Sequence, residues 1–167
     1  SMSYVDLSYA YASLRFDYNA YPTKGNSTEL ALSQRIAPGA FLSALQLRKI
    51  KVMPLNKYNF IYTESNSLFK LLPNENYMDQ KLLGYGTMQM NGLEYYVVDG
   101  NAASVGKLAF HHKLGTITLR NPVTKTFLPE VKYHFWLKLY TNLGYVYSEK
   151  PLNANKLSNT LLRTAGI

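Results

Sequence analysis

The feature that most constrains the fold is residues 131–147, where apolar and polar side chains alternate without a break. The odd positions are Val131, Tyr133, Phe135, Leu137, Leu139, Thr141, Leu143, Tyr145 and Tyr147, and the even positions include Lys132, His134, Lys138, Asn142 and Gly144. A period of two predicts a β-strand with one apolar face. A strand of this length would extend about 55 Å, far beyond the usual soluble strand of about six residues. Long amphipathic strands are typical of membrane β-barrels.

The same period recurs through most of the chain, and helical spacing is hard to find. It predicts strands over 13–19, 27–37, 41–52, 58–63 and 104–119. The predicted fold class is therefore all-β and antiparallel: a transmembrane β-barrel or a partial segment of one.

Two local features interrupt this pattern. Around Lys49 the apolar phase slips, so that Ile50 and Val52 take over the apolar face, which predicts a β-bulge. Residues 64–81 form the longest polar stretch and are expected to connect two strands.

Composition narrows the functional classes. The formal charge is +8, from 18 Lys+Arg against 10 Asp+Glu, but the cations are scattered and accompany no nucleic-acid-binding motif, so nucleic acid is not an expected partner. The chain has 15 Tyr, and tyrosine gathers where one end of a side chain is apolar and the other meets water. The absence of Cys excludes disulfides and thiolate metal sites.

Catalytic and metal-binding motifs are not evident. His111 and His112 are neighbours in a predicted strand, so they face opposite sides and do not bind one ion together. The chain has no Gly-x-Ser-x-Gly sequence, and the Gly84-x-Gly86 pair lacks the remaining glycine and the helix of a phosphate loop. The expectation is a protein without a metal or cofactor that is not an enzyme.

Residues 82–100, LLGYGTMQMNGLEYYVVDG, combine three spaced glycines with aromatic residues and end in a short apolar run. Glycine allows close approach of the backbone to other groups, so this stretch suits a segment packed tightly against something. An ordinary surface loop before a strand is the other interpretation.

Four blocks of sequence resemble one family when taken together. They are FDYNAYPTKG (16–25), LLGYGTMQMNGLEYYVVDG (82–100), LKLYTNLGYVYSE (137–149) and LLRTAGI (161–167). In order and spacing they resemble the C-terminal barrel of the Omp85 superfamily, the BamA- and TamA-like outer-membrane assembly factors, with the closest likeness to Bacteroidetes-type members. The resemblance covers roughly residues 10–167.

The resemblance implies a sixteen-stranded barrel, usually preceded by POTRA domains, that inserts or translocates outer-membrane proteins. Residues 1–167 would form a single β-barrel domain, part of a larger barrel, with no POTRA domain in the chain. Such a piece leaves two open sheet edges, so we expect no closed barrel from these residues alone.

The family also implies a site. Its loop motif Val-Arg-Gly-Phe/Tyr folds into the barrel lumen, and here Gly92 matches while Asn91 and Leu93 replace the arginine and the aromatic residue. The family's lumenal Asp corresponds to Asn142. The implied lumenal loop residues are Asn91, Gly92, Leu93, Glu94 and Asp99, and the implied wall partners are Asn142 and Gly144.

Two amides can hydrogen-bond reciprocally without charge. We therefore expect Asn91 to lie beside Asn142, with Gly92 permitting the close approach. The cations Arg15, Arg35, Arg48, Lys107, Lys132 and Lys138 sit opposite apolar faces and are expected to point away from lipid.

The implied location is the bacterial outer membrane. The implied partners are outer-membrane lipid or lipopolysaccharide and other outer-membrane proteins or assembly subunits. The alternative is a small soluble or membrane β-barrel that binds an apolar ligand, because alternation alone fits that class as well.

Overall fold

A computed structural model describes residues 5–18, 21–37, 40–71, 81–120, 130–149 and 156–167. Strands dominate these residues, as the period of two predicts. They are β1 (Val5–Phe16), β2 (Gly25–Ala37), β3 (Ala40–Pro54), β4 (Asn59–Leu71), β5 (Lys81–Leu83), β6 (Val98–Asp99), β7 (Ala102–Arg120), β8 (Glu130–Tyr147) and β9 (Leu161–Gly166). The all-β prediction is confirmed.

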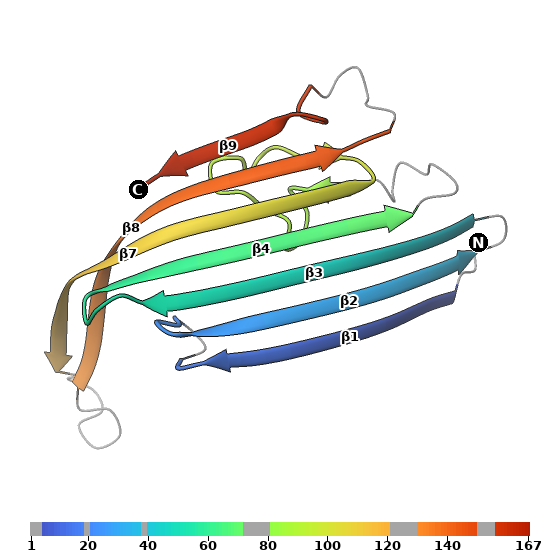
Figure 1. Ribbon diagram of the computed structural model, residues 1–167. Coiled ribbons are helices and arrows are strands. Elements are labelled where there is room, and N and C mark those ends of the chain that lie inside the picture. Colours follow the sequence, from blue (N-terminus) through green and yellow to red (C-terminus); the bar gives the residue numbers. More distant parts are fainter. Residues whose placement is uncertain (1–4, 19–20, 38–39, 72–80, 121–129, 150–155) are drawn as a thin grey trace.

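Seven of the strands form one antiparallel sheet in the order β1-β2-β3-β4-β7-β8-β9 (Figure 1). The exception to pairing in chain order is the insertion between β4 and β7, where β5 and β6 form a separate two-stranded sheet. Among the described residues, β1 and β9 each pair on one side alone, so the sheet is open. The strands that the structure describes do not close into a barrel, as expected for a partial segment.

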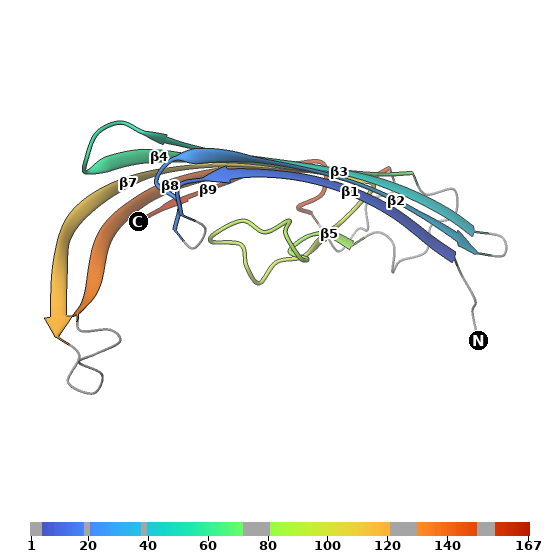
Figure 2. The same ribbon diagram turned by 90° about the horizontal axis from the view of Figure 1, so that it is seen from below.

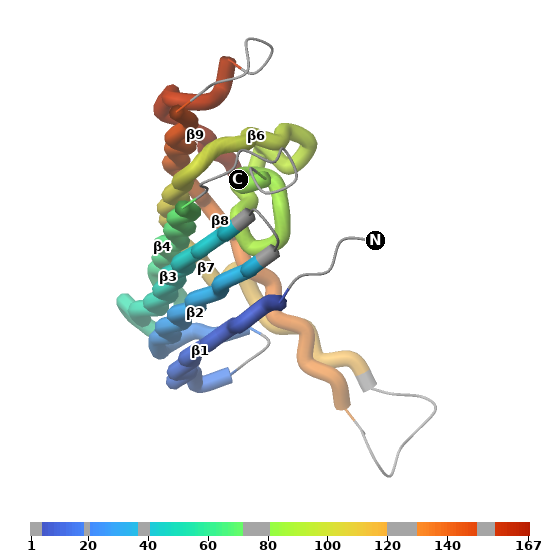
Figure 3. The backbone as a smooth tube through the Cα atoms, turned by 90° about the vertical axis from the view of Figure 1, so that its right-hand side faces the viewer, coloured from blue at the N-terminus to red at the C-terminus, as the bar shows by residue number. Residues whose placement is uncertain are grey.

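The large sheet is curved, and residues 81–101 lie against its concave side (Figure 2). The tube view from the side places the same segment on one side of the sheet, with the opposite side uncovered (Figure 3). We call the covered side the inner face and the uncovered side the outer face. The strand register assigns every strand residue to one of the two, because paired residues point to the same side of a sheet.

Large apolar side chains crowd the outer face, where they are exposed. The register places on this face Val5, Leu7, Tyr9 and Tyr11 of β1, Leu30, Leu32 and Ile36 of β2, Phe41, Leu45 and Leu47 of β3, Phe69 and Leu71 of β4, Leu108, Ile117 and Leu119 of β7, Tyr133, Phe135, Leu137, Leu139, Leu143, Tyr145 and Tyr147 of β8, and Leu161 of β9. A soluble monomer rarely exposes contiguous apolar surface on this scale.

The buried apolar residues lie on the inner face and in the segment that covers it. One cluster joins residues of the covering segment to β7, β8 and β9, and a smaller one contains Ile50, Val52 and Phe60. Phe16 and Trp136 pack against the smaller cluster.

The bulge predicted at Lys49 is wrong, because β3 keeps an unbroken register with both of its neighbours. Instead, the apolar residues of β3 change face along the strand: Leu47 is exposed on the outer face, whereas Ile50 is buried on the inner face. The sheet's register shift lies in β7, between Lys113 and Gly115.

The apolar residues of β1 change face in the same way. The first strand was predicted at 13–19 but spans Val5–Phe16, and its apolar residues move from the outer face to the inner face after Tyr11. Arg15 consequently shares the outer face with Lys51, contrary to its predicted inner placement. At this end of β1, β2 and β3 the outer face carries Arg15, Asn26 and Lys51.

The polar connection predicted over 64–81 is wrong in its first half, because β4 continues to Leu71. Residues 72–80 lie outside the described residues. The strands predicted over 27–37, 104–119 and 131–147 are confirmed as β2, β7 and β8.

Candidate functional site

Residues 81–101 pack on the inner face through an apolar cluster. Leu82, Leu83, Met88, Met90 and Val98 come from this segment, and each is at most 2 % exposed. They meet small and branched side chains of β7, β8 and β9, namely Ala103, Val105, Val146 and Leu162. Burying a side chain of this kind stabilises by roughly 1.5–3 kcal/mol, so the segment is held firmly against the sheet.

Met90 of the segment packs closely on Gly144 of β8. A Cβ atom built on Gly144 would lie 2.3 Å from the Met90 sulfur, far inside van der Waals contact. Gly144 is therefore the position in β8 where the lack of a side chain makes room for Met90. The prediction that Gly144 belongs to the wall beside this loop agrees with that contact.

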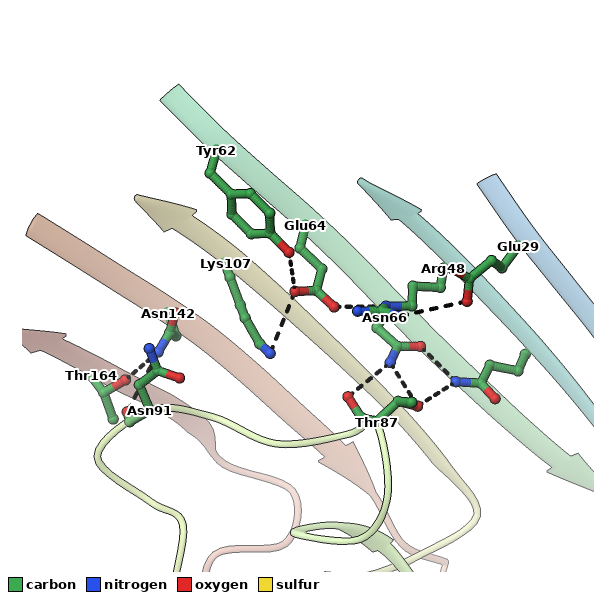
Figure 4. A network of polar contacts seen from close by, with 11 residues as sticks. Glu29, Arg48, Tyr62, Glu64, Asn66, Thr87, Asn91, Lys107, Asn142 and Thr164 are labelled. Atoms are coloured by element: carbon green, nitrogen blue, oxygen red, sulfur yellow. Dashed lines mark hydrogen bonds and ion pairs between the residues drawn. The ribbon is translucent and has the colours of Figure 1, made fainter. Parts of the chain in front are cut away.

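Asn142 lies two residues before Gly144 and is 1 % exposed. In the amide orientation that satisfies both ends, its Oδ1 accepts from the Asn91 backbone N–H at 3.2 Å and from the Thr164 hydroxyl at 3.1 Å. Its Nδ2 then donates to the Thr141 carbonyl at 3.1 Å. In the opposite orientation Nδ2 donates to the Asn91 carbonyl at 3.4 Å, so the partner is the Asn91 backbone either way (Figure 4).

The structure therefore brings Asn91 and Asn142 together, but not through the predicted reciprocal pair of side-chain amides. A backbone group is the partner, so the contact does not depend on which side chain occupies position 91. Thr164 of β9 is a third member that the sequence did not single out.

The predicted reason for Gly92 is wrong. A Cβ atom there would lie 3.6 Å from Thr164, an ordinary contact, so close approach does not require glycine. Glycine is required at position 92 because its φ is +85°, a conformation that L side chains rarely adopt. The exposed Glu94 carboxylate accepts from the Gly92 N–H at 2.8 Å, and this bond lowers the Glu94 pKa.

The other two predicted loop residues have lesser contacts. Leu93 is half-buried against the apolar cluster. Asp99 pairs with Lys81 across the β5–β6 ladder, and its buried Oδ1 has no hydrogen-bond partner among the described residues.

A second polar contact, which the sequence did not reveal, holds the same segment to β3 and β4. The Thr87 hydroxyl accepts from Gln46 Nε2 at 2.8 Å and from Asn66 Nδ2 at 3.3 Å, and Asn66 Nδ2 also lies 3.1 Å from the Thr87 carbonyl (Figure 4). Asn66 is 1 % exposed. Polar contacts at Thr87 and Asn91 thus flank the buried Met88 and Met90.

Between these two contacts the inner face carries a charge network (Figure 4). Glu64 of β4 accepts from Arg48 Nε at 2.8 Å and from the Tyr62 hydroxyl at 2.8 Å, and it lies 3.5 Å from Lys107 Nζ. Glu29 lies 3.5 Å from Arg48 on the other side. Every ion in the network has a partner of opposite charge, which offsets the cost of burying them.

Sequence reasoning placed Glu64 in a loop and missed this network. The signal was present, since Phe60, Tyr62, Glu64, Asn66 and Leu68 continue one alternation that fixes them on the same face. The predicted inner placement of Arg48 and Lys107 is confirmed by the register.

The adjacent histidines face opposite sides, as predicted. His111 Nδ1 is 2.7 Å from the Tyr21 hydroxyl on the inner face, and His112 Nδ1 is 2.7 Å from Asn59 Oδ1 on the outer face. Within the described ranges no three His, Asp or Glu side chains gather as a metal site.

No helix among the described residues is long and apolar enough to cross a membrane. Neither a scan against protein-family models nor searches of curated proteins and of solved structures finds a match to this chain.

Proposed function

We propose that this chain is a wall segment of an outer-membrane β-barrel of the Omp85 type. Residues 81–101 would be its lumenal loop, and its role would be the insertion, assembly or translocation of outer-membrane proteins. The location would be the bacterial outer membrane, in contact with lipid or lipopolysaccharide. The sequence resemblance supplies the family, and the arrangement of the two faces supports the barrel.

The observation that carries the proposal is the reversal of polarity between the faces. Exposed apolar side chains cover the outer face, while the inner face buries Glu64, Asn66 and Asn142 at 6 % exposure or less. In a membrane barrel the outward positions meet lipid and the inward positions meet water or polar groups. In β1 and β3 the apolar residues change from the outer face to the inner face toward one end of the strand. This change of face fits strand ends that extend beyond the hydrocarbon layer.

The way residues 81–101 are held also supports a lumenal loop. Two buried amides, Asn66 and Asn142, bind the segment at Thr87 and Asn91, with two buried methionines between these points. A loop fixed at both ends of a short stretch supports the wall it lies on.

The open edges bear on the proposed activity. β1 and β9 each leave one side of the strand unpaired among the described residues. In hydrocarbon each unpaired backbone group costs several kcal/mol, so further strands must pair with these edges. Additional barrel strands or a client strand could do so by strand addition, which is the assembly mechanism we propose.

The alternative, a small barrel that binds an apolar ligand, is favoured less. Such a protein lines its concave side with apolar side chains around a cavity, whereas here the larger cluster of apolar side chains on that side packs on the protein's own residues 81–101.

Detergent dependence tests the proposal. The purified chain should stay dispersed in detergent micelles and aggregate when detergent is removed, because its outer face is apolar. A monodisperse chain in buffer without detergent would overturn the membrane assignment. Matched variants with two outer-face leucines changed to lysine, Leu45→Lys and Leu139→Lys, should need less detergent.

A further inference from the structure

A cavity of about 240 Å³ opens on the inner face beside the charge network. Its lining comes from the turn after β1, from β4, β7 and β8, and from Asn91 of the covering segment. The volume lies below the 300–1,000 Å³ typical of drug-sized ligands, so the cavity suits a small group.

One wall of the cavity is aromatic and fixed. The His111 ring stacks on Phe60 at 4.4 Å between centroids with 8° between the planes. Tyr21 closes over this pair and bonds its hydroxyl to His111 Nδ1 at 2.7 Å. Phe60 and His111 are 3 % and 6 % exposed, so the wall is formed without a ligand.

The other wall carries an excess of positive charge. Glu64 already binds Arg48, Lys107 and the Tyr62 hydroxyl, so its oxygens are engaged. Lys138 also lines the cavity, and its ammonium lies 5.5 Å from the Tyr140 ring centroid. Within the described part of the chain Lys138 forms no ion pair with an acid.

Three cationic side chains therefore face two carboxylates, Glu29 and Glu64, in this part of the inner face. Asn142, Tyr21 and Tyr140 lie on the same lining. We propose that this cavity binds one anionic group, a carboxylate or a phosphate, held by Lys138 and seated against the aromatic wall. Charge-assisted hydrogen bonds of this kind are among the strongest in proteins.

Trp136, the chain's one tryptophan, provides the readout. The Trp136 ring centroid lies 5.9 Å from that of Tyr21 and 5.1 Å from that of Phe60. A bound group that moves either neighbouring ring therefore changes the fluorescence emission of Trp136. The detergent-solubilised full chain is titrated with inorganic phosphate and, separately, with benzoate at constant ionic strength.

The proposal predicts saturable binding of phosphate, benzoate or both, and the more tightly bound probe identifies the anionic group. Lys138→Gln should weaken binding by about tenfold or more, while Lys138→Arg should retain it. Lys132→Gln is the matched control, because Lys132 lies on the same strand and face but lines a different cavity.

Absence of saturation with both probes would overturn the proposal. An equal loss in Lys138→Gln and Lys132→Gln would also overturn it, because general charge would then explain the binding. Circular dichroism of each variant verifies that the sheet has formed. The test does not depend on a membrane role, so its failure would leave the proposed function standing.

Discussion

The contact between Gly144 and Met90 gives the sharpest structural prediction. In Gly144→Ala the new methyl group would lie 2.3 Å from the Met90 sulfur, against the 3.4–4 Å of ordinary contact. The Met90 side chain is flexible but only 1 % exposed, so it must move aside within the packed cluster or shift the segment that carries it. Overpacking of this kind costs about 1–3 kcal/mol.

Hydrogen exchange of residues 84–98, followed by mass spectrometry in detergent, measures the effect where it acts. A loss of 1–3 kcal/mol in local stability corresponds to about 5- to 150-fold faster exchange. Gly106→Ala is the matched control, since Gly106 lies in the neighbouring strand with nothing within 4 Å of a new Cβ. That variant should exchange as the original protein does.

Met90→Ala should relieve the clash, so the two substitutions should be less than additive in a double-mutant cycle. If Gly144→Ala and Gly106→Ala gave the same exchange rates in residues 84–98, the packing of this segment on β8 would be refuted.

Three further outcomes are expected. Asn142→Ala should destabilise the chain by about 1–3 kcal/mol, because it leaves the Asn91 backbone N–H without its acceptor, whereas Asn91→Ala should keep that bond; equal urea-unfolding midpoints for the two variants would contradict this assignment. Glu64→Gln should cost about 1.5–3 kcal/mol, since Lys107 loses its carboxylate and Arg48 keeps Glu29 alone, and an unchanged unfolding midpoint would dismiss the network. The hydrogen bond from Thr23 lowers the pKa of Asp17 below its ordinary 3.8. The ionised Asp17 carboxylate therefore stabilises the turn fully above pH 3.8, and this contribution is lost as the pH falls through the lower pKa of the folded state. Thr23→Val should raise that pKa in an NMR titration, and an unmoved midpoint would remove the assigned cause.

Strand positions could be predicted where one face stays apolar along the whole strand. β8 is such a strand, and alternation alone placed both its residues and its faces. β3 is not, because its apolar residues change faces near Lys49, and a change of face in an unbroken strand gives the same sequence pattern as an inserted residue.

The site was only partly accessible to sequence reasoning. The family motif directed attention to Asn91 and Asn142, which do meet, but a motif does not say whether a side chain or the backbone makes the contact. Glu64 and Thr87 were missed because Arg48 lies 16 residues from Glu64 and Gln46 lies 41 residues from Thr87 in the sequence, and only the folded sheet with the segment packed on it brings them together.

The most direct test of the central claim, that the outer face meets lipid, is spin labelling of positions 137–140 in a reconstituted bilayer. Leu137 and Leu139 are 38 % and 42 % exposed on the outer face, whereas Lys138 and Tyr140 point to the inner face. Labels at 137 and 139 should be relaxed by oxygen dissolved in the lipid, and labels at 138 and 140 should be reached by a water-soluble relaxing agent or shielded from both. Equal accessibility to oxygen at all four positions would contradict the account.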